Sequence, residues 1–173
     1  MDNLPQDEFE GFERVWRRVM GAKPDGEEPL PWEGGGAVVA EQAPPDPAKT
    51  LRALMDAERA SYLFYTALLR RCAQQGRVAL TRLAADEARH LKELQLEHFL
   101  LLGEAYTPAE GYQKQPGILN ALRTAYLSEK KSVAEYLAAA EQEAERAPLY
   151  RALAAEEMGH AEVLRKLIEK TLR

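Results

Sequence analysis

Hydrophobic residues recur at three- and four-residue steps through most of the chain, which is the pattern of amphipathic helices. Asp46 and Pro47 suit the N-cap and the first position of a helix. The first long helix is therefore predicted from 47 to about 75, with Gly76 marking its end. Three more helices are expected, over about 78–102, over about 117–146 and from Pro148 onward. This pattern predicts an all-α four-helix bundle.

The segment between the second and third helices is unusually long for a bundle. Residues 103–116 include Pro108, Gly111 and Pro116, so they are predicted to form an extended connection. At up to about 3.3 Å per residue, such a segment can run the length of a helix. A connection of this kind lets two helix hairpins pack with the long crossover of ferritin-like bundles, rather than in simple up-down-up-down order.

The N-terminal part differs in kind from the rest. Residues 1–46 hold six prolines and the run Gly34–Gly36, which exclude one continuous helix. Within them an aromatic stripe predicts a short amphipathic helix over about 8–20, formed by Phe9, Phe12, Trp16 and Val19. A helix this short is marginal alone in water, so it either folds back on the bundle or docks on a partner. We expect an extension over 1–46 and a bundle over 47–173.

Polar positions inside the apolar stripes carry the candidate chemistry. The sequence LAADEARH at 83–90 is repeated as LAAEEMGH at 153–160, and each copy places a Glu and a His three residues apart on one helix face. A single Glu-x-x-His is common on helix surfaces. Here, however, the alignment of the copies also brings an isolated Glu and a Tyr of each half into register, namely Glu58 with Tyr65 and Glu129 with Tyr136. The chain is therefore interpreted as a duplicated helix hairpin.

Each half of this duplication supplies one isolated Glu and one Glu-x-x-His from the middle of an apolar stripe. A buried ionised carboxylate costs several kcal/mol unless it is paired or bound to a cation. Four carboxylates and two neutral imidazoles would balance two divalent cations, and facing helices of a bundle hold such metal pairs. The candidate ligands are Glu58, Glu87, His90, Glu129, Glu157 and His160. Oxygen and nitrogen ligands suit iron or manganese better than zinc, so two iron ions are expected, with manganese as the alternative.

Charge and composition narrow the function classes. The formal net charge of -5 argues against binding to nucleic acid or to a membrane surface. The acidic N-terminus does not resemble a secretory signal, and no apolar run approaches the length of a membrane span, so a cytoplasmic location is expected. Cys72 is the single cysteine, which excludes an internal disulfide and a thiolate metal site.

With these motifs, residues 47–173 resemble the rubrerythrin branch of the ferritin-like di-iron superfamily. The string DEARH at 86–90 is also similar to the Asp-Glu-x-Arg-His motif of related di-iron oxidases. The resemblance implies that the six candidate residues bind the metals and that Glu87 and Glu157 bridge both of them. It also implies a catalytic centre that reacts with hydrogen peroxide or dioxygen.

The resemblance assigns roles to residues beside the ligands as well. Tyr65 and Tyr136 would be catalytic-site hydrogen-bond donors beside the ligands, although plain core packing explains tyrosines at these positions equally well. Asp86 and Glu156 would orient the two imidazoles. His98 also points inward but has no counterpart in the second repeat, so a structural role is expected for it.

Two departures from the family pattern matter. Full-length rubrerythrins carry a rubredoxin-like domain with Cys-x-x-Cys pairs, which this sequence lacks, so a separate electron-donor protein is expected. Rubrerythrins also place an additional Glu three residues after the third-helix ligand, and here that position is Ser132, mirrored by Ser61 in the first half. The site therefore looks more like a symmetric six-ligand oxidase centre.

The leading hypothesis is a rubrerythrin-like di-iron oxidoreductase. One alternative is a ferroxidase that handles iron for a storage shell, to which the N-terminal aromatic helix would dock. Another is a non-catalytic coat or scaffold bundle. The outer face of the first helix carries small and large apolar residues, which predicts a homodimer through Ala53, Ala60, Leu63, Phe64 and Ala67.

Overall fold

The computed structural model describes residues 46–72, 74–112, 114 and 117–172. The predicted helix over about 8–20 lies outside these residues. The described chain forms four α-helices and contains no strand, as the sequence pattern predicted. The helices are α2 (Pro47–Leu69), α3 (Gln74–Leu102), α4 (Ile118–Gln142) and α5 (Ala147–Thr171).

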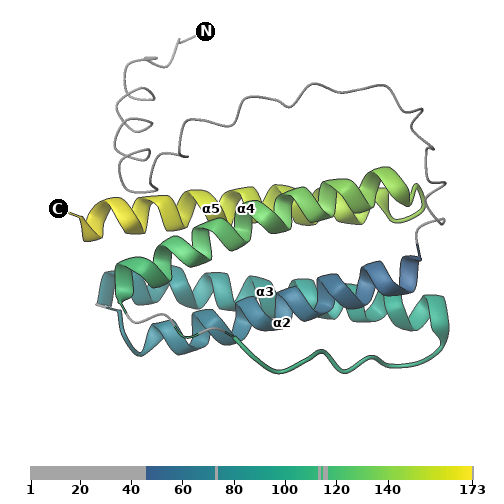
Figure 1. Ribbon diagram of the computed structural model, residues 1–173, viewed down its shortest axis with the longest axis horizontal. Helices are drawn as coiled ribbons and strands as arrows, with labels where there is room; N and C mark the ends of the chain where they lie inside the picture. The colour runs from purple at the N-terminus through teal and green to yellow at the C-terminus, as the bar shows by residue number, and fades with distance from the viewer. Residues whose placement is uncertain (1–45, 73, 113, 115–116, 173) are drawn as a thin grey trace, which may run out of the picture. The chain divides into compact units, whose positions relative to one another are not determined.

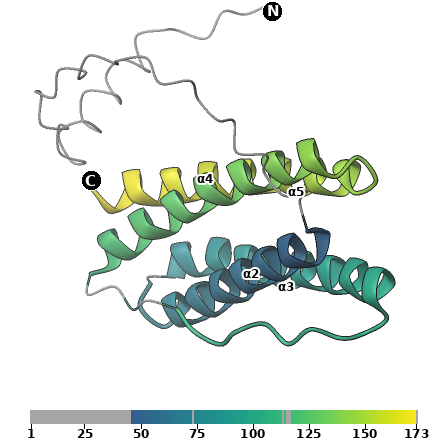
Figure 2. The ribbon, with the colours of Figure 1, turned by 45° about the vertical axis from the view of Figure 1, so that its right-hand side comes forward.

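Two antiparallel hairpins build the bundle. Helix α2 packs along α3 and α4 packs along α5, so that each hairpin forms one layer (Figures 1 and 2). The segment after α3 runs back along the first hairpin, and α4 then starts at the end of the bundle where α3 began (Figure 1). The long crossover between repeated hairpins is thus confirmed.

Local sequence explains several helix ends. The Asp46 carboxylate accepts hydrogen bonds from the backbone N–H groups of Ala48 at 3.0 Å and Lys49 at 3.3 Å, and Pro47 is the first residue of α2, as predicted. Helix α3 ends as expected before Gly103, whose φ of 72° is left-handed. The backbone N–H of Gly103 donates to the Phe99 carbonyl at 2.7 Å, which satisfies a terminal carbonyl of the helix.

Other helix ends differ from the predicted ones. Helix α2 stops at Leu69 rather than near 75, and α3 begins at Gln74, so Gly76 lies in its first turn instead of ending α2. A glycine costs only about 1 kcal/mol in a helix interior and is a weak stop signal. Helix α4 stops at Gln142 rather than 146, because the chain turns at Glu143, whose φ and ψ of -129° and 88° are not helical.

The core has two apolar regions. One includes Leu51, Met55, Tyr136, Tyr150 and Leu153, and the other includes Tyr65, Leu80, Leu83, Leu122 and Leu164. Both draw residues from the two hairpins, and together they hold the layers against each other. Buried charged residues supplied by all four helices accompany these apolar regions.

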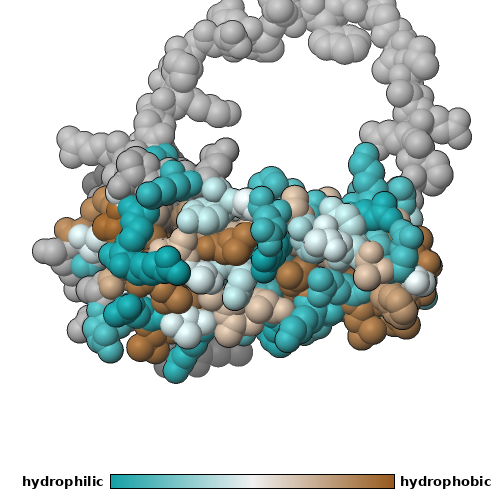
Figure 3. Space-filling model, turned by 90° about the horizontal axis from the view of Figure 1, so that it is seen from below, coloured by the Kyte–Doolittle hydropathy of each residue, from teal (hydrophilic) through white to brown (hydrophobic). Residues whose placement is uncertain are grey.

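The crossover covers part of the outer face of α2. The Tyr106 hydroxyl and the Ala109 backbone N–H donate to the Asp56 carboxylate at 3.0 and 2.8 Å, and the Phe64 ring lies edge-on to the Tyr112 ring at 6.0 Å. Leu63 and Phe64 are half-buried within one chain. Seen from this side, hydrophobic areas are interspersed with hydrophilic ones (Figure 3). The homodimer through this face stays a prediction.

Candidate metal centre

All six residues predicted as ligands lie inside the bundle. Each of these residues is at most 5% exposed. Helices α2 and α4 each supply one Glu, and α3 and α5 each supply a Glu and a His, one turn apart. The apolar stripe of each helix therefore aims its charged residues at one point between the layers.

The ligand atoms form two overlapping groups. The first consists of Glu58, Glu87, His90 and Glu157, and the second of Glu87, Glu129, Glu157 and His160. Within each group the candidate ligand atoms lie within 4.8 Å of one another. Glu87 and Glu157 belong to both groups, which is the arrangement expected of two carboxylates that bridge a pair of cations.

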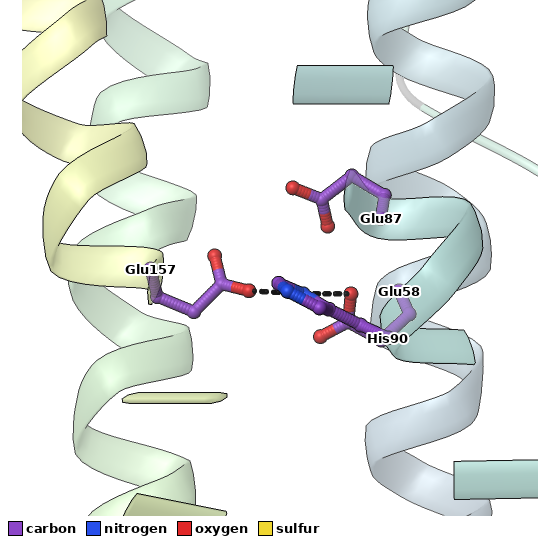
Figure 4. A group of neighbouring side chains, drawn as sticks. All are labelled: Glu58, Glu87, His90 and Glu157. Atoms are coloured by element: carbon purple, nitrogen blue, oxygen red, sulfur yellow. Dashed lines mark ion pairs between the residues drawn. The ribbon is translucent and has the colours of Figure 1, made fainter. Parts of the chain in front are cut away.

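Distances around the imidazoles identify the nitrogen that faces the cluster. His90 Nδ1 lies 2.9 Å from Glu157 Oε1 and 3.4 Å from Glu58 Oε2. Figure 4 shows Glu157 approaching His90 from one layer while Glu58 approaches it from the other. His160 Nδ1 lies 3.0 Å from Glu87 Oε1 and 3.3 Å from Glu157 Oε2. In both halves Nδ1 points inward, and Nε2 points away from the cluster.

Several buried atoms of the cluster lack a hydrogen-bond partner of acceptable geometry among the described residues. They are Glu58 Oε2, Glu87 Oε1, His90 Nδ1 and Glu157 Oε1. Unpaired buried polar atoms normally cost about 1–3 kcal/mol each. Because these four belong to one cluster and are all metal-ligand types, the residues fit a cation between them. The buried cluster is compatible with a metal site.

The imidazoles have strongly perturbed acidities. Burial disfavours the charged form of His90, but the close carboxylates of Glu157 and Glu58 outweigh this effect and raise the pKa of His90 to about 10. Burial also opposes charge on His160, and its contacts with Glu129, Glu157 and Glu87 raise the pKa of His160 well above its usual range. Both imidazoles are therefore in the positively charged imidazolium form at neutral pH when no cation is bound.

The carboxyl groups divide into two kinds. Burial is the main cause that raises the pKa of Glu129 to about 8, and burial, followed by repulsion from Glu58 and Glu129, raises that of Glu87 well above its usual range. For Glu157, the close contacts with His160 and His90 overcome the effect of burial and lower the pKa. The cluster thus limits its buried charge by taking up protons on some carboxyls, which a bound cation would replace.

The two tyrosines each contact a carboxylate of the other hairpin. The Tyr136 hydroxyl of α4 donates to Glu58 of α2 at 2.5 Å, and the Tyr65 hydroxyl of α2 donates to Glu129 of α4. Burial, and then the nearby carboxylates, raise the pKa of both phenols. Each phenol thus hydrogen bonds to an isolated carboxylate of the opposite hairpin, which links the two halves across the bundle.

Asp86 and Glu156, which precede the motif carboxylates, each lie close to the imidazole of the other hairpin. Glu156 Oε2 lies 3.2 Å from His90 Nε2, and Asp86 Oδ2 lies 3.5 Å from His160 Nε2. A carboxylate at Nε2 keeps the proton on that nitrogen and leaves Nδ1 free to bind a cation. His98, by contrast, accepts from Arg52 Nε at 3.0 Å and lies 3.1 Å from the Glu104 carbonyl, so its contacts are structural.

Comparison with solved structures finds a protein of similar fold. No protein-family model matches the chain, and no match was found among curated proteins. A solved structure of a hypothetical protein from Pyrococcus furiosus superposes with a TM-score of 0.65, at 24% identity, over 73% of this chain and 90% of that chain. The bundle and its buried cluster fit the ferritin-like di-iron fold. At this identity the likeness concerns the fold alone.

One residue near the site gained no role from its sequence position. Arg89 belongs to the DEARH string, yet its contacts depend on α5: its guanidinium bonds to Glu156, which in turn contacts His90. The only sequence signal was the replacement of this arginine by Gly159 in the second copy of the motif.

No described helix is both long and apolar enough to span a membrane.

Proposed function

We propose that this protein is a rubrerythrin-like di-iron oxidoreductase that reduces hydrogen peroxide or dioxygen. The observation that supports it most is the pair of overlapping ligand groups that share Glu87 and Glu157. Two divalent cations would neutralise four carboxylates while both imidazoles stay neutral. The ligand set is rich in oxygen, which favours iron or manganese over zinc, and we take iron as the native metal.

A bound pair of ferrous ions would supply the two electrons that break the O–O bond of peroxide. Reduction of one hydrogen peroxide to two water molecules would consume these two electrons together with two protons. A separate electron-donor protein would return the two electrons. The residues of the chain would bind the cations through Nδ1 and carboxylate oxygens and would keep protonated phenols next to Glu58 and Glu129.

A pocket beside Tyr65 offers a route for a small oxidant. It has a volume of about 270 Å³ and lies between α2 and α4, under Tyr112 of the crossover. Its wall includes Ser61, Ser128 and the Tyr65 side chain, which hydrogen bonds to Glu129 of the cluster. We propose that peroxide or dioxygen approaches the metal pair from this side.

Stopped-flow mixing of the ferrous protein with hydrogen peroxide tests this function. We expect a ferric absorption band within seconds. About two irons should be oxidised for each hydrogen peroxide consumed. The control is a double variant, Glu87→Gln with Glu157→Gln, which removes the shared carboxylates and should abolish the fast phase. Oxidation no faster than that of free ferrous ion would contradict the proposal.

Iron oxidation for storage is a second candidate. Ser132 stands where rubrerythrins have an additional Glu, and it is buried on α4, three residues after Glu129. This substitution favours dioxygen as the oxidant and ferrous ion as the substrate. Aerobic titration separates the candidates, because ferroxidase turnover continues far beyond two irons per chain, whereas a redox enzyme without its electron donor stops at two.

A further inference from the structure

The two halves of the cluster differ by one charged residue. Superposing LAADEARH at 83–90 on LAAEEMGH at 153–160 places Arg89 opposite Gly159. The ligands, the tyrosines and the acidic residues behind the imidazoles are otherwise matched in both halves. A guanidinium is therefore built into one half of a nearly symmetric site.

Arg89 lies against the outer edge of the His90 imidazole. Its Nη2 donates to Glu156 Oε2 and lies 3.3 Å from His90 Nε2. Its Nη1 donates to Glu93 on the same helix at 2.9 Å, which fixes the direction of the side chain. The carboxylate behind His90 is therefore neutralised by direct hydrogen bonding to an arginine.

The imidazole of the second half has a different surrounding. His160 Nε2 lies 3.5 Å from Asp86 Oδ2, and Arg89 Nη2 is 3.5 Å from the other oxygen of that carboxylate. This contact is longer than the hydrogen bond between Arg89 and Glu156. Position 159, the counterpart of Arg89, is a glycine and brings no charge.

We propose that Arg89 makes the two positions of the metal pair inequivalent, so that the position held by His90 binds a divalent cation more weakly than the position held by His160. This inference rests on the proposed metal pair. A carboxylate at the outer nitrogen makes an imidazole a stronger ligand, and an arginine that hydrogen bonds to that carboxylate reduces the effect. The guanidinium also repels a cation held through the same ring.

The size of the effect follows from the position of Arg89. Changes to groups that contact metal ligands typically alter metal affinity 10–100-fold. The Arg89 side chain is 42% exposed, so solvent screens part of its charge. We therefore expect an effect of about tenfold on the His90 position and less than about threefold on the His160 position.

Single-position variants isolate the two affinities. His160→Gln leaves the His90 position, and His90→Gln leaves the His160 position. Calorimetric titration with Co²⁺ measures each affinity, and the visible spectrum of bound Co²⁺ reports its ligands. Adding Arg89→Ala should tighten Co²⁺ binding about tenfold in the His160→Gln protein and change it little in the His90→Gln protein.

Further variants separate charge from structure. Arg89→Lys keeps a positive charge and should leave the His90 position weak, whereas Arg82→Ala, at an exposed arginine of the same helix, should change neither affinity. A Cβ atom added at Gly159 would meet no atom of another part of the described chain within 4 Å, so Arg89→Gly combined with Gly159→Arg can move the arginine to the other half. This exchange should make the His160 position the weaker one.

The outcomes are distinguishable. Equal changes in both single-position proteins, no change in either, or weaker binding at the His90 position after Arg89→Ala would overturn the role of Arg89 alone. Absence of Co²⁺ binding by the unsubstituted protein would overturn the proposed metal pair itself. Circular dichroism of each metal-free variant checks that the bundle is folded before titration.

Discussion

The protons held by the metal-free cluster provide a quantity that can be counted when a cation is added. Imidazole and carboxylate groups bind metals only in their deprotonated forms. The pKa values of His90 (about 10) and Glu129 (about 8) lie above 7 and those of His160 and Glu87 are raised, so the metal-free cluster carries several protons near pH 7. Adding Mn²⁺ to the metal-free protein should therefore displace these protons.

The expected number follows from which groups are protonated near pH 7. The two imidazolium groups and Glu129 give a release of about three protons per chain, and the raised pKa of Glu87 brings the release to about three to four. Glu157 contributes none, because its contacts with the two imidazoles lower its pKa. By linkage, the constant for binding both ions should rise by about three to four powers of ten per pH unit near pH 7.

Calorimetry in buffers with different ionisation enthalpies measures this release, since the observed heat changes in proportion to the protons transferred to the buffer. The matched control is Glu143→Gln, which alters a buried carboxyl outside the cluster that accepts from Tyr150. The control should release the same number as the unsubstituted protein. Release of one proton or none would refute the reasoning from the buried cluster.

Three further predictions concern stability and assembly. The metal-free protein should lose stability as the pH rises from about 5 to about 10. In the folded protein the pKa values of Glu129 (about 8) and His90 (about 10) exceed their usual values of 4.5 and 6.5, so folding is favoured while these groups are protonated. Denaturant titrations across this pH range test the direction of the change. Glu129→Gln removes a carboxylate ligand and should weaken Mn²⁺ binding. Because Gln keeps an acceptor for the Tyr65 hydroxyl, the variant should stabilise the metal-free bundle by about 1–2 kcal/mol at pH 9, measured by urea unfolding. Destabilisation at this pH would count against the ligand role of Glu129. Leu63→Glu should convert the predicted dimer to a monomer in light scattering, and an unchanged mass would exclude this face of α2.

The sequence was sufficient to predict which residues face the interior. Helical periodicity fixes the face on which a residue lies, so a Glu in the middle of an apolar stripe has to point inward. Duplication then made the set of six recognisable, because two accidental copies of the same polar pattern are improbable. The bundle, its two hairpins and the crossover followed from the same periodicity and from the length of one connection.

Contacts between the hairpins could not be predicted in the same way. That Tyr65 bonds to Glu129 and Tyr136 to Glu58 depends on how far one hairpin is shifted along the other. The contact of Arg89 with Glu156 depends on that same shift. A periodic pattern within one helix carries no information about it, and packing between layers decides it.

The ends of α2 and α4 and the cover of α2 were also beyond the sequence pattern. Gly76 was a reasonable stop signal, but a glycine in a first turn costs little because N–H groups there have no partner within the helix. From the sequence, the outer face of α2 was interpreted only as a dimer interface. In the structure, the crossover packs on this face, where the Asp56 carboxylate accepts hydrogen bonds from Tyr106 and Ala109.

The number of metal ions bound per chain tests the central claim most directly. The metal-free protein is dialysed anaerobically against ferrous ion, and elemental analysis then gives the iron retained per chain. We predict about two irons per chain, and fewer than about one in the double variant Glu87→Gln with Glu157→Gln, since both positions lose their shared carboxylates. Less than one iron in the unsubstituted protein, or an unchanged content in the double variant, would contradict the assignment of this cluster as a metal pair.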